Sequence, residues 1–369
     1  MARVVVAMSG GVDSSVTAWL LARQGHEVIG LFMRHGVDVG PFAPVGGTCR
    51  RRTCCSAADA ADARRVADQI GIPFYAINFS DQFAQLVDYF VEEYLQGRTP
   101  NPCIRCNSWL KFGELFRYAD SLGAEFVATG HYARIVREDP SGTPALLRGV
   151  DSEKDQSYVL FEIHRERLGR ILLPLGELTK SRVRQIAQQA GLRVAEKQES
   201  QEICFVGENG HGELVRRVRP DRNTSGPIVT LDGTPVGWHP GIENFTVGQR
   251  KGLGVALGKR FYVVRIDPGS NTVVVGPREA LANYGLLADG ANWLIDPPQT
   301  PFECQVKIRY RSPAVPATVI PIGEKAFQVR FHQACYAITP GQAAVCYDGD
   351  RVLGGGWIRS VLENESGPQ

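Results

Sequence analysis

The sequence of 369 residues has few cysteines for its length and no long hydrophobic run. Nine irregularly spaced cysteines are too few for a disulfide scaffold, which predicts reduced thiols that are available for chemistry. No apolar stretch approaches the roughly 18 residues that span a membrane. The first residues, "MARVVVAMSGG", contain only a short apolar run before glycines and do not resemble an export signal. These absences predict a cytoplasmic protein with no membrane partner.

An excess of charge of one sign is also missing. Lysine and arginine total 41 against 39 aspartates and glutamates, so the net charge of +2 indicates no particular partner. The basic residues are nevertheless clumped, for example at Arg50–Arg52 and where Lys307, Arg309 and Arg311 alternate. Such clumps are typical of proteins that hold an anionic partner on one face, and also of ordinary solvated surface charge.

The length predicts two or three domains. Residues 1–204 alternate strand and helix patterns, which predicts an α/β domain with a parallel sheet. After residue 205, turn motifs such as "LDGTP" and "DPGSN" separate short β-branched runs. This pattern predicts two small, mostly antiparallel β domains over 205–285 and 286–362, followed by a loose tail over 363–369.

Within the first domain, hydrophobic periodicity and capping residues locate individual elements. Ser56 and Asp59 resemble a capping box, and Gly71 ends the helix that follows them. Strands are expected at 3–8, 27–33 and 73–79, and a strand that runs into a loop is expected over 124–135. Helices are expected at 14–24, 56–71, 81–96 and 179–190.

The stretch "AMSGGVDSS" (7–15) follows the first expected strand and opens the first expected helix. Gly10 and Gly11 permit a tight turn whose N–H groups point into a concavity at a helix N-terminus, an arrangement that attracts phosphate. Asp13 is a poor neighbour for phosphate unless a cation lies between them, which indicates Mg²⁺. The stretch has neither the Walker pattern nor the dinucleotide-binding pattern of glycines.

S-G-G-x-D-S after a first strand resembles the pyrophosphate loop (PP-loop) of the ATP pyrophosphatase superfamily, whose members cleave ATP between its α- and β-phosphates. A chance glycine-rich turn is the alternative. Eight further stretches, spread in order over nearly the whole chain, resemble the bacterial tRNA-specific 2-thiouridylases, the MnmA/TrmU family: "GLFM", "GRTPNPCIRCNSWLKF", "ATGHYAR", "DSEKDQSYVL", "QEICFVGE", "FTVGQRKGLG", "VKIRYRS" and "ITPGQAAVCYDG". The resemblance implies an N-terminal domain like the adenine nucleotide alpha hydrolases, a central β-rich domain and a C-terminal β-barrel that binds tRNA.

The resemblance also implies the reaction, in which sulfur replaces O2 of the wobble uridine in tRNAs for Lys, Glu and Gln. ATP adenylates O2, so that AMP becomes the leaving group. The ATP-binding positions that the resemblance implies are Ala7, Met8, Ser9, Gly10, Gly11, Val12, Asp13, Ser14, Met33 and Gly130. The structural alternatives to ATP binding are a core role for Met33 and a turn role for Gly130.

Two cysteines match the family's sulfur-handling positions. Cys204 matches the residue that carries the persulfide, which a sulfur donor protein supplies, and Cys106 matches the second thiol of the exchange. Thiols suit this role because sulfur transfer proceeds by thiolate attack through mixed disulfides. A Cys106–Cys204 disulfide is then a resting or by-product state, and the alternative is that both are buried, inert thiols.

The same resemblance implies a set of tRNA contacts. Lysine and arginine suit phosphates, tyrosine suits stacking on an exposed base, and a base in a single-stranded loop is easier to extrude. A lone histidine is more often structural, but His131 directly follows Gly130, an implied ATP-binding position, which favours a place in the site. The implied positions are Asn101, Pro102, Cys103, His131, Lys154, Asp155, Gln156, Arg309, Tyr310 and Gln342.

Cys103 departs from the family pattern, because many members have an aspartate there. A thiol has a higher reference pKa, roughly 8.5 against 3.9, so it is a different acid–base group near neutral pH. Cys103, Cys106 and Cys204 form a three-thiol set that suits a [4Fe–4S] cluster with one open iron, a persulfide relay in which Cys103 is a bystander, or zinc. Zinc would usually need a fourth ligand, and none is obvious.

Three further cysteines lie in "GTCRRRTCCS", where Cys49, Cys54 and Cys55 surround three arginines at an expected helix start. The stretch is interpreted as a surface loop of this lineage, with contact to tRNA phosphates or to a sulfur donor as the functional alternative. Cys304, Cys335 and Cys346 are expected in the core of the β-rich half.

Two competing functions stay open at this point. The first is another adenylating thiolase or amidase of the superfamily. The similarity to the tRNA-specific 2-thiouridylases continues through the β-rich half, which weighs against it. A catalytically inactive tRNA-binding protein is the alternative from another class, and intact Asp13, Cys106 and Cys204 argue against it.

Overall fold

The computed structural model describes residues 1–35, 56–137, 143–198, 203–206, 210–255 and 258–362. These residues form two compact units. The first comprises residues 1–86, 103–205 and 350–352, and the second comprises 87–102, 206–349 and 353–369. The predicted boundaries of three domains and a tail stay a prediction. Residues 47–55 of the "GTCRRRTCCS" stretch and the tail lie outside the described residues.

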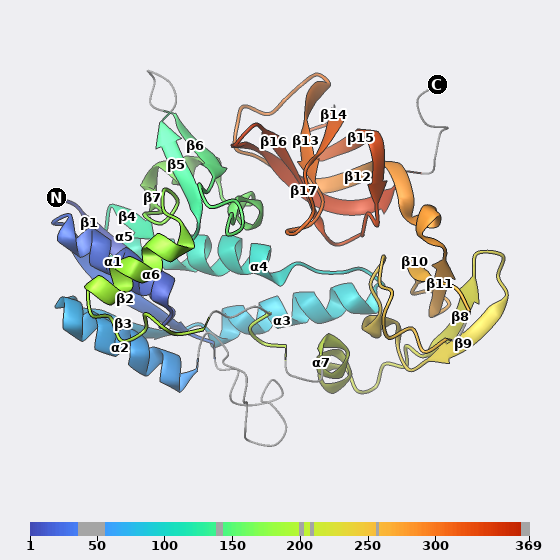
Figure 1. Ribbon diagram of the computed structural model, residues 1–369, viewed down its shortest axis with the longest axis horizontal. Coiled ribbons are helices and arrows are strands. Elements are labelled where there is room, and N and C mark those ends of the chain that lie inside the picture. Colours follow the sequence, from blue (N-terminus) through green and yellow to red (C-terminus); the bar gives the residue numbers. More distant parts are fainter. Residues whose placement is uncertain (36–55, 138–142, 199–202, 207–209, 256–257, 363–369) are drawn as a thin grey trace. The chain divides into compact units, whose positions relative to one another are not determined.

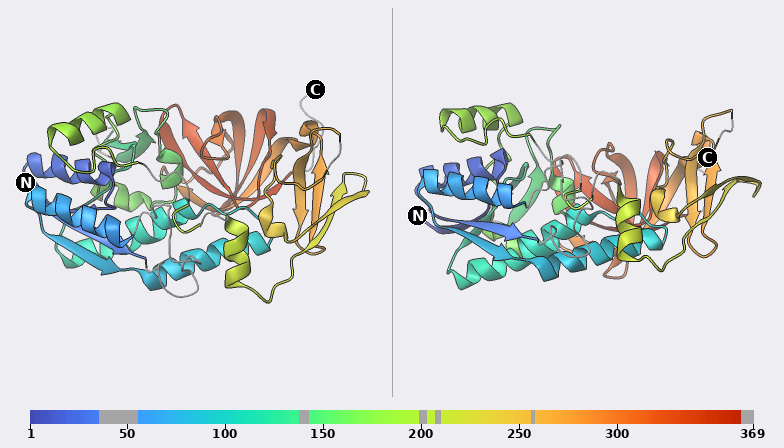
Figure 2. Two further views of the ribbon diagram at one scale, coloured as in Figure 1. Left: turned by 60° about the horizontal axis from the view of Figure 1, so that its bottom comes forward. Right: turned by 90° about the horizontal axis from the view of Figure 1, so that it is seen from below.

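A five-stranded parallel sheet forms the centre of the first unit, in the order β3-β2-β1-β4-β7. Figure 2 shows α1 and α2 on one side of this sheet and α5 on the other. The elements of this sheet and its connections are β1 (Arg3–Ala7), α1 (Val12–Arg23), β2 (Glu27–Arg34), α2 (Ala57–Ile70), β3 (Phe74–Asn78), α3 (Ser80–Leu95), α5 (Leu115–Ser121), β4 (Phe126–Ala128), β7 (Ile171–Leu172) and α6 (Lys180–Gln189). The predicted α/β domain with a parallel sheet is confirmed.

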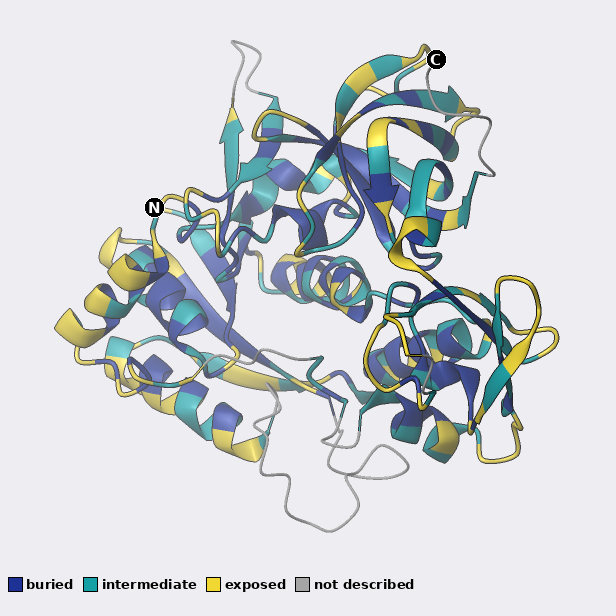
Figure 3. Ribbon diagram, turned by 45° about the vertical axis from the view of Figure 1, so that its right-hand side comes forward, coloured by how far each residue is buried: buried dark blue, intermediate teal, exposed yellow. Residues whose placement is uncertain are grey.

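The central strands are buried on both faces, as their apolar sequences predict. Val4, Val5 and Val6 of β1 have no exposed surface. Figure 3 shows the sheet interior as buried and the outer faces of its helices as exposed. The capping box of Ser56 and Asp59 is present at the start of α2, and Gly71 ends the helix with φ of 79°.

The segment 124–135, expected as a strand that runs into a loop, begins in that way. β4 joins the parallel sheet, and Gly130 lies in the loop after it, where the backbone turns against the start of α1. The sequence analysis missed the strand that follows, β5 (Ala133–Arg137), which pairs antiparallel with β6 (Pro144–Arg148). The apolar run continues from the loop into β5, so periodicity alone did not separate the two.

Between α3 and β4 the chain forms a helical stretch that the sequence patterns did not locate. It consists of α4 (Pro102–Arg105), the π-helix η2 (Cys106–Glu114) and α5. Two 3₁₀ helices, η3 (Ser157–Leu160) and η4 (Arg165–Arg170), follow the β5–β6 hairpin.

From residue 210 on, the second unit contains a helix that the sequence analysis also missed, α7 (His211–Val218), and is otherwise rich in β-structure. One sheet has the order β10-β11-β8-β9, in which β11 and β8 are parallel and the other pairs antiparallel. Its strands are β8 (Gly226–Thr230), β9 (Pro235–His239), β10 (Tyr262–Asp267) and β11 (Thr272–Gly276).

Six further strands close into a barrel (Figure 1), in the order β12-β15-β14-β13-β16-β17 with β17 paired back to β12. The predicted C-terminal β-barrel is therefore confirmed. Cys335 and Cys346 are buried in its core, as expected, and Cys304 is half-buried. The strands are β12 (Ala282–Trp293), β13 (Phe302–Lys307), β14 (Val315–Ile322), β15 (Ala326–Tyr336), β16 (Ala343–Asp348) and β17 (Arg351–Val361).

Candidate functional site

The PP-loop connects the carboxyl end of β1 to the first turn of α1. Gly11 is the N-cap of α1, and Gly10 has φ of 72°. The N–H of Ser9 donates to Oγ of Ser14 at 3.1 Å, and this hydroxyl donates to the carbonyl of Gly11 at 3.2 Å. These bonds hold a turn above a helix N-terminus, whose first N–H groups have no intrahelical acceptor and carry the positive end of the helix dipole. The loop therefore has the geometry of an anion site.

Gly130 lies directly against this loop. A Cβ atom at Gly130 would lie 2.8 Å from the carbonyl carbon of Asp13 and 2.9 Å from the nitrogen of Ser14. Only glycine permits this approach, so Gly130 has a role beyond a turn. β2 and β4 flank β1 on opposite sides, which makes the loop a topological switch point where α/β proteins bind ligands.

The other predicted ATP-binding side chains differ in exposure. Met33 is half-buried near the carboxyl end of β2. Met8 is 2% exposed, and it packs so closely on Gly30 that a Cβ there would lie 2.6 Å from its sulfur. Met8 is therefore a core side chain, and only its backbone belongs to the loop.

Lys180, which the sequence analysis missed, joins the PP-loop from the first turn of α6. Its Nζ lies 2.7 and 2.8 Å from the two carboxylate oxygens of Asp13. The Tyr132 hydroxyl donates to the same carboxylate at 2.7 Å. A lysine in the first turn of a helix is unfavourable for the helix dipole, and this misfit is the signal that a sequence reader had available.

Lys197 was also missed, and it braces the loop from the other side. Its Nζ donates to the carbonyl of Gly10 at 2.8 Å and forms ion pairs of 2.6 Å with Asp59 and Asp62 of α2. Asp59 is 4% exposed and also belongs to the capping box. The PP-loop is thus fixed to the N-terminus of α2 by a buried ion pair.

The predicted Mg²⁺ depended on Asp13 needing a cation. Lys180 supplies one in the structure, so Asp13 meets a metal ion only by exchanging this partner. Mg²⁺ stays a prediction whose original argument no longer applies.

Cys106 is the first residue of the π-helix η2, and Cys103 is an exposed residue of α4. π-Helical turns are rare and frequent at functional sites. Arg105 forms an ion pair with Glu162, whose carboxylate also accepts the hydroxyl of Ser108 at 2.6 Å. These contacts hold the half-buried Cys106 between two anchored residues.

Cys204 is half-buried in the same unit, directly before Phe205. The Phe205 ring is buried and packs edge-on against Phe83 of α3, with 5.5 Å between ring centroids. Cys103, Cys106 and Cys204 are all thiols in the structure.

The three-thiol metal site does not fit the structure. Among the described residues, which include all three cysteines, no three His, Cys, Asp or Glu side chains are placed to hold a metal ion. We therefore route no step through an iron–sulfur cluster or zinc.

His131 is 6% exposed, and its Nδ1 shares a hydrogen bond of 2.7 Å with the hydroxyl of Thr129. Burial, and then the charge of Lys111, lower the pKa of His131 well below its usual value. The imidazole is neutral at physiological pH, and a tRNA contact would use a neutral donor or acceptor.

Lys154, Asp155 and Gln156 are also predicted tRNA contacts, and the side chains of the last two form hydrogen bonds within the protein. Asp155 is buried and accepts from the N–H groups of Gly149 and Ser157, at 3.1 and 3.0 Å. The side-chain carbonyl of Gln156 accepts from the N–H of Tyr132 at 3.0 Å. Lys154 is half-buried in the turn before them.

In the second unit, Gln342 and Arg309 also contact backbone carbonyls. The amide of Gln342 donates to the carbonyls of Thr99 and Pro100, at 3.0 and 3.1 Å. These carbonyls directly precede half-buried Asn101 and buried Pro102, so Gln342 positions the segment that leads to Cys103 and Cys106.

Arg309 donates to the carbonyls of Val247 and Ala337, at 2.8 and 2.9 Å. The neighbouring Tyr310 ring lies 5.7 Å from Nζ of Lys307. Arg309 therefore joins the small sheet domain to the barrel, and its predicted tRNA role stays untested.

Three family models match consecutive parts of the chain. They are the tRNA methyl transferase HUP domain at residues 2–208, the tRNA methyl transferase PRC-barrel domain at 213–277 and the aminomethyltransferase β-barrel domain at 283–358. Among the described residues, no helix is long and apolar enough to cross a membrane.

Curated relatives match over nearly the whole chain. Proteins named tRNA-specific 2-thiouridylase MnmA are 48% identical in Rhodopirellula baltica, over 99% of this chain and 98% of theirs, and 52% identical in Geobacter metallireducens, over 98% and 97%. A solved 4-thiouridine synthetase–RNA complex with bound ATP aligns with a TM-score of only 0.36 at 17% identity, covering 60% of this chain and 51% of that one. A likeness this weak carries no argument.

Proposed function

This chain belongs to the family of tRNA-specific 2-thiouridylases, and we propose that it thiolates the wobble uridine of tRNAs for Lys, Glu and Gln at the cost of ATP. The observation that carries the proposal is 48–52% identity to such enzymes over 98–99% of the chain. The PP-loop supports it, because its geometry suits the phosphates of ATP.

ATP binding in this proposal uses the N–H groups of the PP-loop and the first turn of α1. Gly130 permits β4 to lie directly against the loop, and Lys180 supplies a positive charge next to it. Uridine O2 attacks the α-phosphorus, pyrophosphate leaves, and the adenylated oxygen becomes part of a good leaving group.

The sulfur steps use Cys204 and Cys106. A donor protein leaves a persulfide on Cys204, and its terminal sulfur attacks C2 of the adenylated uridine while AMP departs. The Cys106 thiolate then attacks Sγ of Cys204, which releases 2-thiouridine and forms a Cys106–Cys204 disulfide. The transferred sulfur gains two electrons and the two thiols lose them, so an external dithiol must reduce the disulfide before the next turnover. Cys103 is the bystander or proton-transfer residue of this scheme.

Nucleoside mass spectrometry of tRNA from a deletion strain tests the proposal. The 2-thiouridine of tRNAs for Lys, Glu and Gln is expected to disappear and to return when the gene is restored. Unchanged 2-thiouridine in the deletion strain would refute the function.

A further inference from the structure

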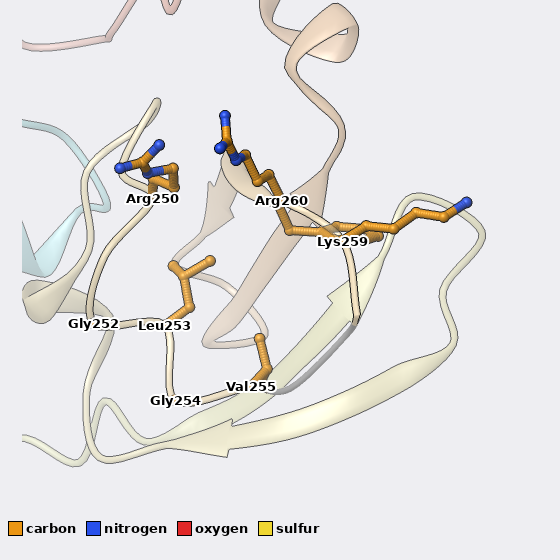
Figure 4. A pocket seen from close by; sticks show the side chains of 8 residues that line it. Arg250, Gly252, Leu253, Gly254, Val255, Lys259 and Arg260 are labelled. Atoms are coloured by element: carbon orange, nitrogen blue, oxygen red, sulfur yellow. The ribbon is translucent and has the colours of Figure 1, made fainter.

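A pocket of about 540 Å³ opens beside the β10-β11-β8-β9 sheet of the second unit, and none of the residues that the reaction uses lines it. Figure 4 shows it between the loop that follows Gln249 and the segment that enters β10. The residues that line it are Arg250, Gly252, Leu253, Gly254, Val255, Lys259, Arg260 and Phe261.

The walls of this pocket are held in place. The N–H of Gly248 donates to the carbonyl of Val263 at 2.7 Å, and the N–H of Val263 donates to the carbonyl of Gln249 at 2.9 Å. These two bonds join the segments on both sides of the pocket. Leu253 is 8% exposed and belongs to the core of the domain, and Phe261 packs against that core. The charged side chains around the pocket therefore project from a backbone that hydrogen bonds and core packing hold in place.

The charge around the pocket has one sign. From Asn244 to Ile266 the chain contains no Asp or Glu, and Arg250, Lys251, Lys259 and Arg260 are all exposed. Within the described part of the chain, none of these four forms an ion pair. In Figure 4 the side chains of Arg250 and Arg260 rise on the same side of the loop, and Lys259 extends away from them.

We propose that this pocket binds phosphodiester groups of the tRNA substrate through Arg250 and Arg260. A guanidinium group binds phosphate oxygens in a bidentate manner, and Gly252 and Gly254 have no side chains to obstruct a close approach. The inference rests on the proposed function, since a tRNA substrate brings a phosphate with every nucleotide. An acidic protein surface is the rival ligand, and tRNA is favoured because the relatives of this chain are named as enzymes that act on tRNA.

Binding of an unmodified tRNA transcript at several KCl concentrations tests this site. Arg250→Gln/Arg260→Gln is expected to raise the Kd about 10-fold at low salt and to reduce the slope of log K against log salt by about two, because each lost phosphate contact removes about one unit. Arg250→Lys/Arg260→Lys keeps the charges and is expected to keep the slope. The matched control is Arg222→Gln/Arg265→Gln, which removes two exposed arginines of the same domain outside the pocket.

The outcomes separate this site from the function itself. A wild-type protein that neither binds nor thiolates tRNA overturns the proposed function. A wild-type protein that thiolates tRNA, with a pocket variant that matches the control in Kd and slope, overturns this inference alone. Unchanged tRNA binding with slower sulfur delivery from the donor protein also overturns it, because the pocket then serves a protein. The KM for ATP is expected to stay unchanged in every pocket variant that is folded by circular dichroism.

Discussion

At the scale of residues, two lysines pair with the aspartates in and beside the PP-loop, and the Mg²⁺ that the sequence predicted there stays a prediction. Asp13 and Asp59 are each paired with a largely buried ammonium group, from Lys180 and Lys197. Neither lysine belongs to a recognisable motif, and only the fold brings them to the loop from 167 and 187 residues away in the sequence. Residue patterns could predict the loop itself because all of its parts are local.

Replacement of Lys180 tests its role. Lys180→Met is expected to lower kcat/KM for ATP about 100-fold, because a charge fixed beside the phosphates is lost. It also leaves the carboxylate of Asp13 without its cation, which costs about 2 kcal/mol of stability, less than at a fully buried pair because Asp13 is partly exposed. Urea unfolding and steady-state kinetics measure the two effects.

The double variant Lys180→Met/Asp13→Asn separates them. It is expected to recover most of the stability but not the activity. The exposed Arg182 of the same helix provides the control, as Arg182→Met. A Lys180→Met enzyme with a wild-type kcat/KM for ATP would contradict the assignment.

His131 predicts a pH dependence of stability. Burial lowers its pKa in the folded protein. Below about pH 6.5 the unfolded chain binds a proton here that the folded chain does not, so the free energy of unfolding falls by up to about 1.4 kcal/mol per pH unit as the pH drops. Burial also lowers the pKa of His211 and His239, so these two histidines change the stability with pH in the same direction.

Urea unfolding of His131→Gln at about pH 7.5 and about pH 5.5 measures this contribution. The variant is expected to lose less stability between the two pH values than the wild type, and the exposed His164→Gln control is expected to match the wild type. Equal pH dependence in His131→Gln and wild type would show that His131 is not held neutral.

The cysteines give a third prediction. Cys106→Ser and Cys204→Ser are each expected to abolish thiolation and to retain tRNA binding, because an alcohol can neither carry a persulfide nor attack a disulfide. Cys103→Ser is expected to retain activity if Cys103 is a bystander, and purification without oxygen is expected to give an active enzyme free of iron. An active Cys204→Ser enzyme, or activity that follows iron content, would contradict the relay.

At the scale of elements, the sequence predicts well wherever one period persists. The strand that contains Val4–Val6 and the helix expected over 56–71 were predicted with errors of one or two residues, because burial and capping leave local signals in the sequence. The π-helix from Cys106 to Glu114 has no such signal, since its hydrogen bonds follow neither the α-helical nor the strand period. α7 was missed because the turn motifs and β-branched runs after residue 205 predicted only β-structure in that part of the chain.

Gly130→Ala tests the close approach between β4 and the PP-loop. The added methyl group must displace the backbone at Asp13 and Ser14, which is expected to cost about 1–3 kcal/mol of stability and to raise the KM for ATP. Gly169→Ala is the control, because its nearest neighbour is a proline side-chain carbon at 3.4 Å, an ordinary contact. Thermal unfolding and ATP kinetics measure the difference. If the two variants behave alike, Gly130 does not restrict the loop.

The candidate site could be predicted from the sequence only in part. The resemblance located Gly130 and Gln342, whereas the fold shows what they contact. Asp155 and Gln156 were predicted to contact tRNA, and in the structure they hold the turn beside Tyr132, a distinction that residue type alone does not carry.

At the scale of the whole molecule, the two units carry different parts of the account. The PP-loop, Lys180, Cys106 and Cys204 belong to the first unit, and the basic pocket belongs to the second. ATP chemistry and sulfur chemistry are therefore expected to respond to substitutions in the first unit. Salt-dependent tRNA affinity is expected to respond to substitutions in the second.

Reconstitution with purified components tests the central claim most directly. Unmodified tRNA, ATP and a persulfide donor are incubated with the wild-type protein or with Cys106→Ser, and 2-thiouridine is measured by nucleoside mass spectrometry alongside AMP. The account predicts wobble 2-thiouridine in amounts that match AMP, only with ATP and only with the wild type. Absence of 2-thiouridine with a folded wild-type protein, or its formation without ATP, would contradict it.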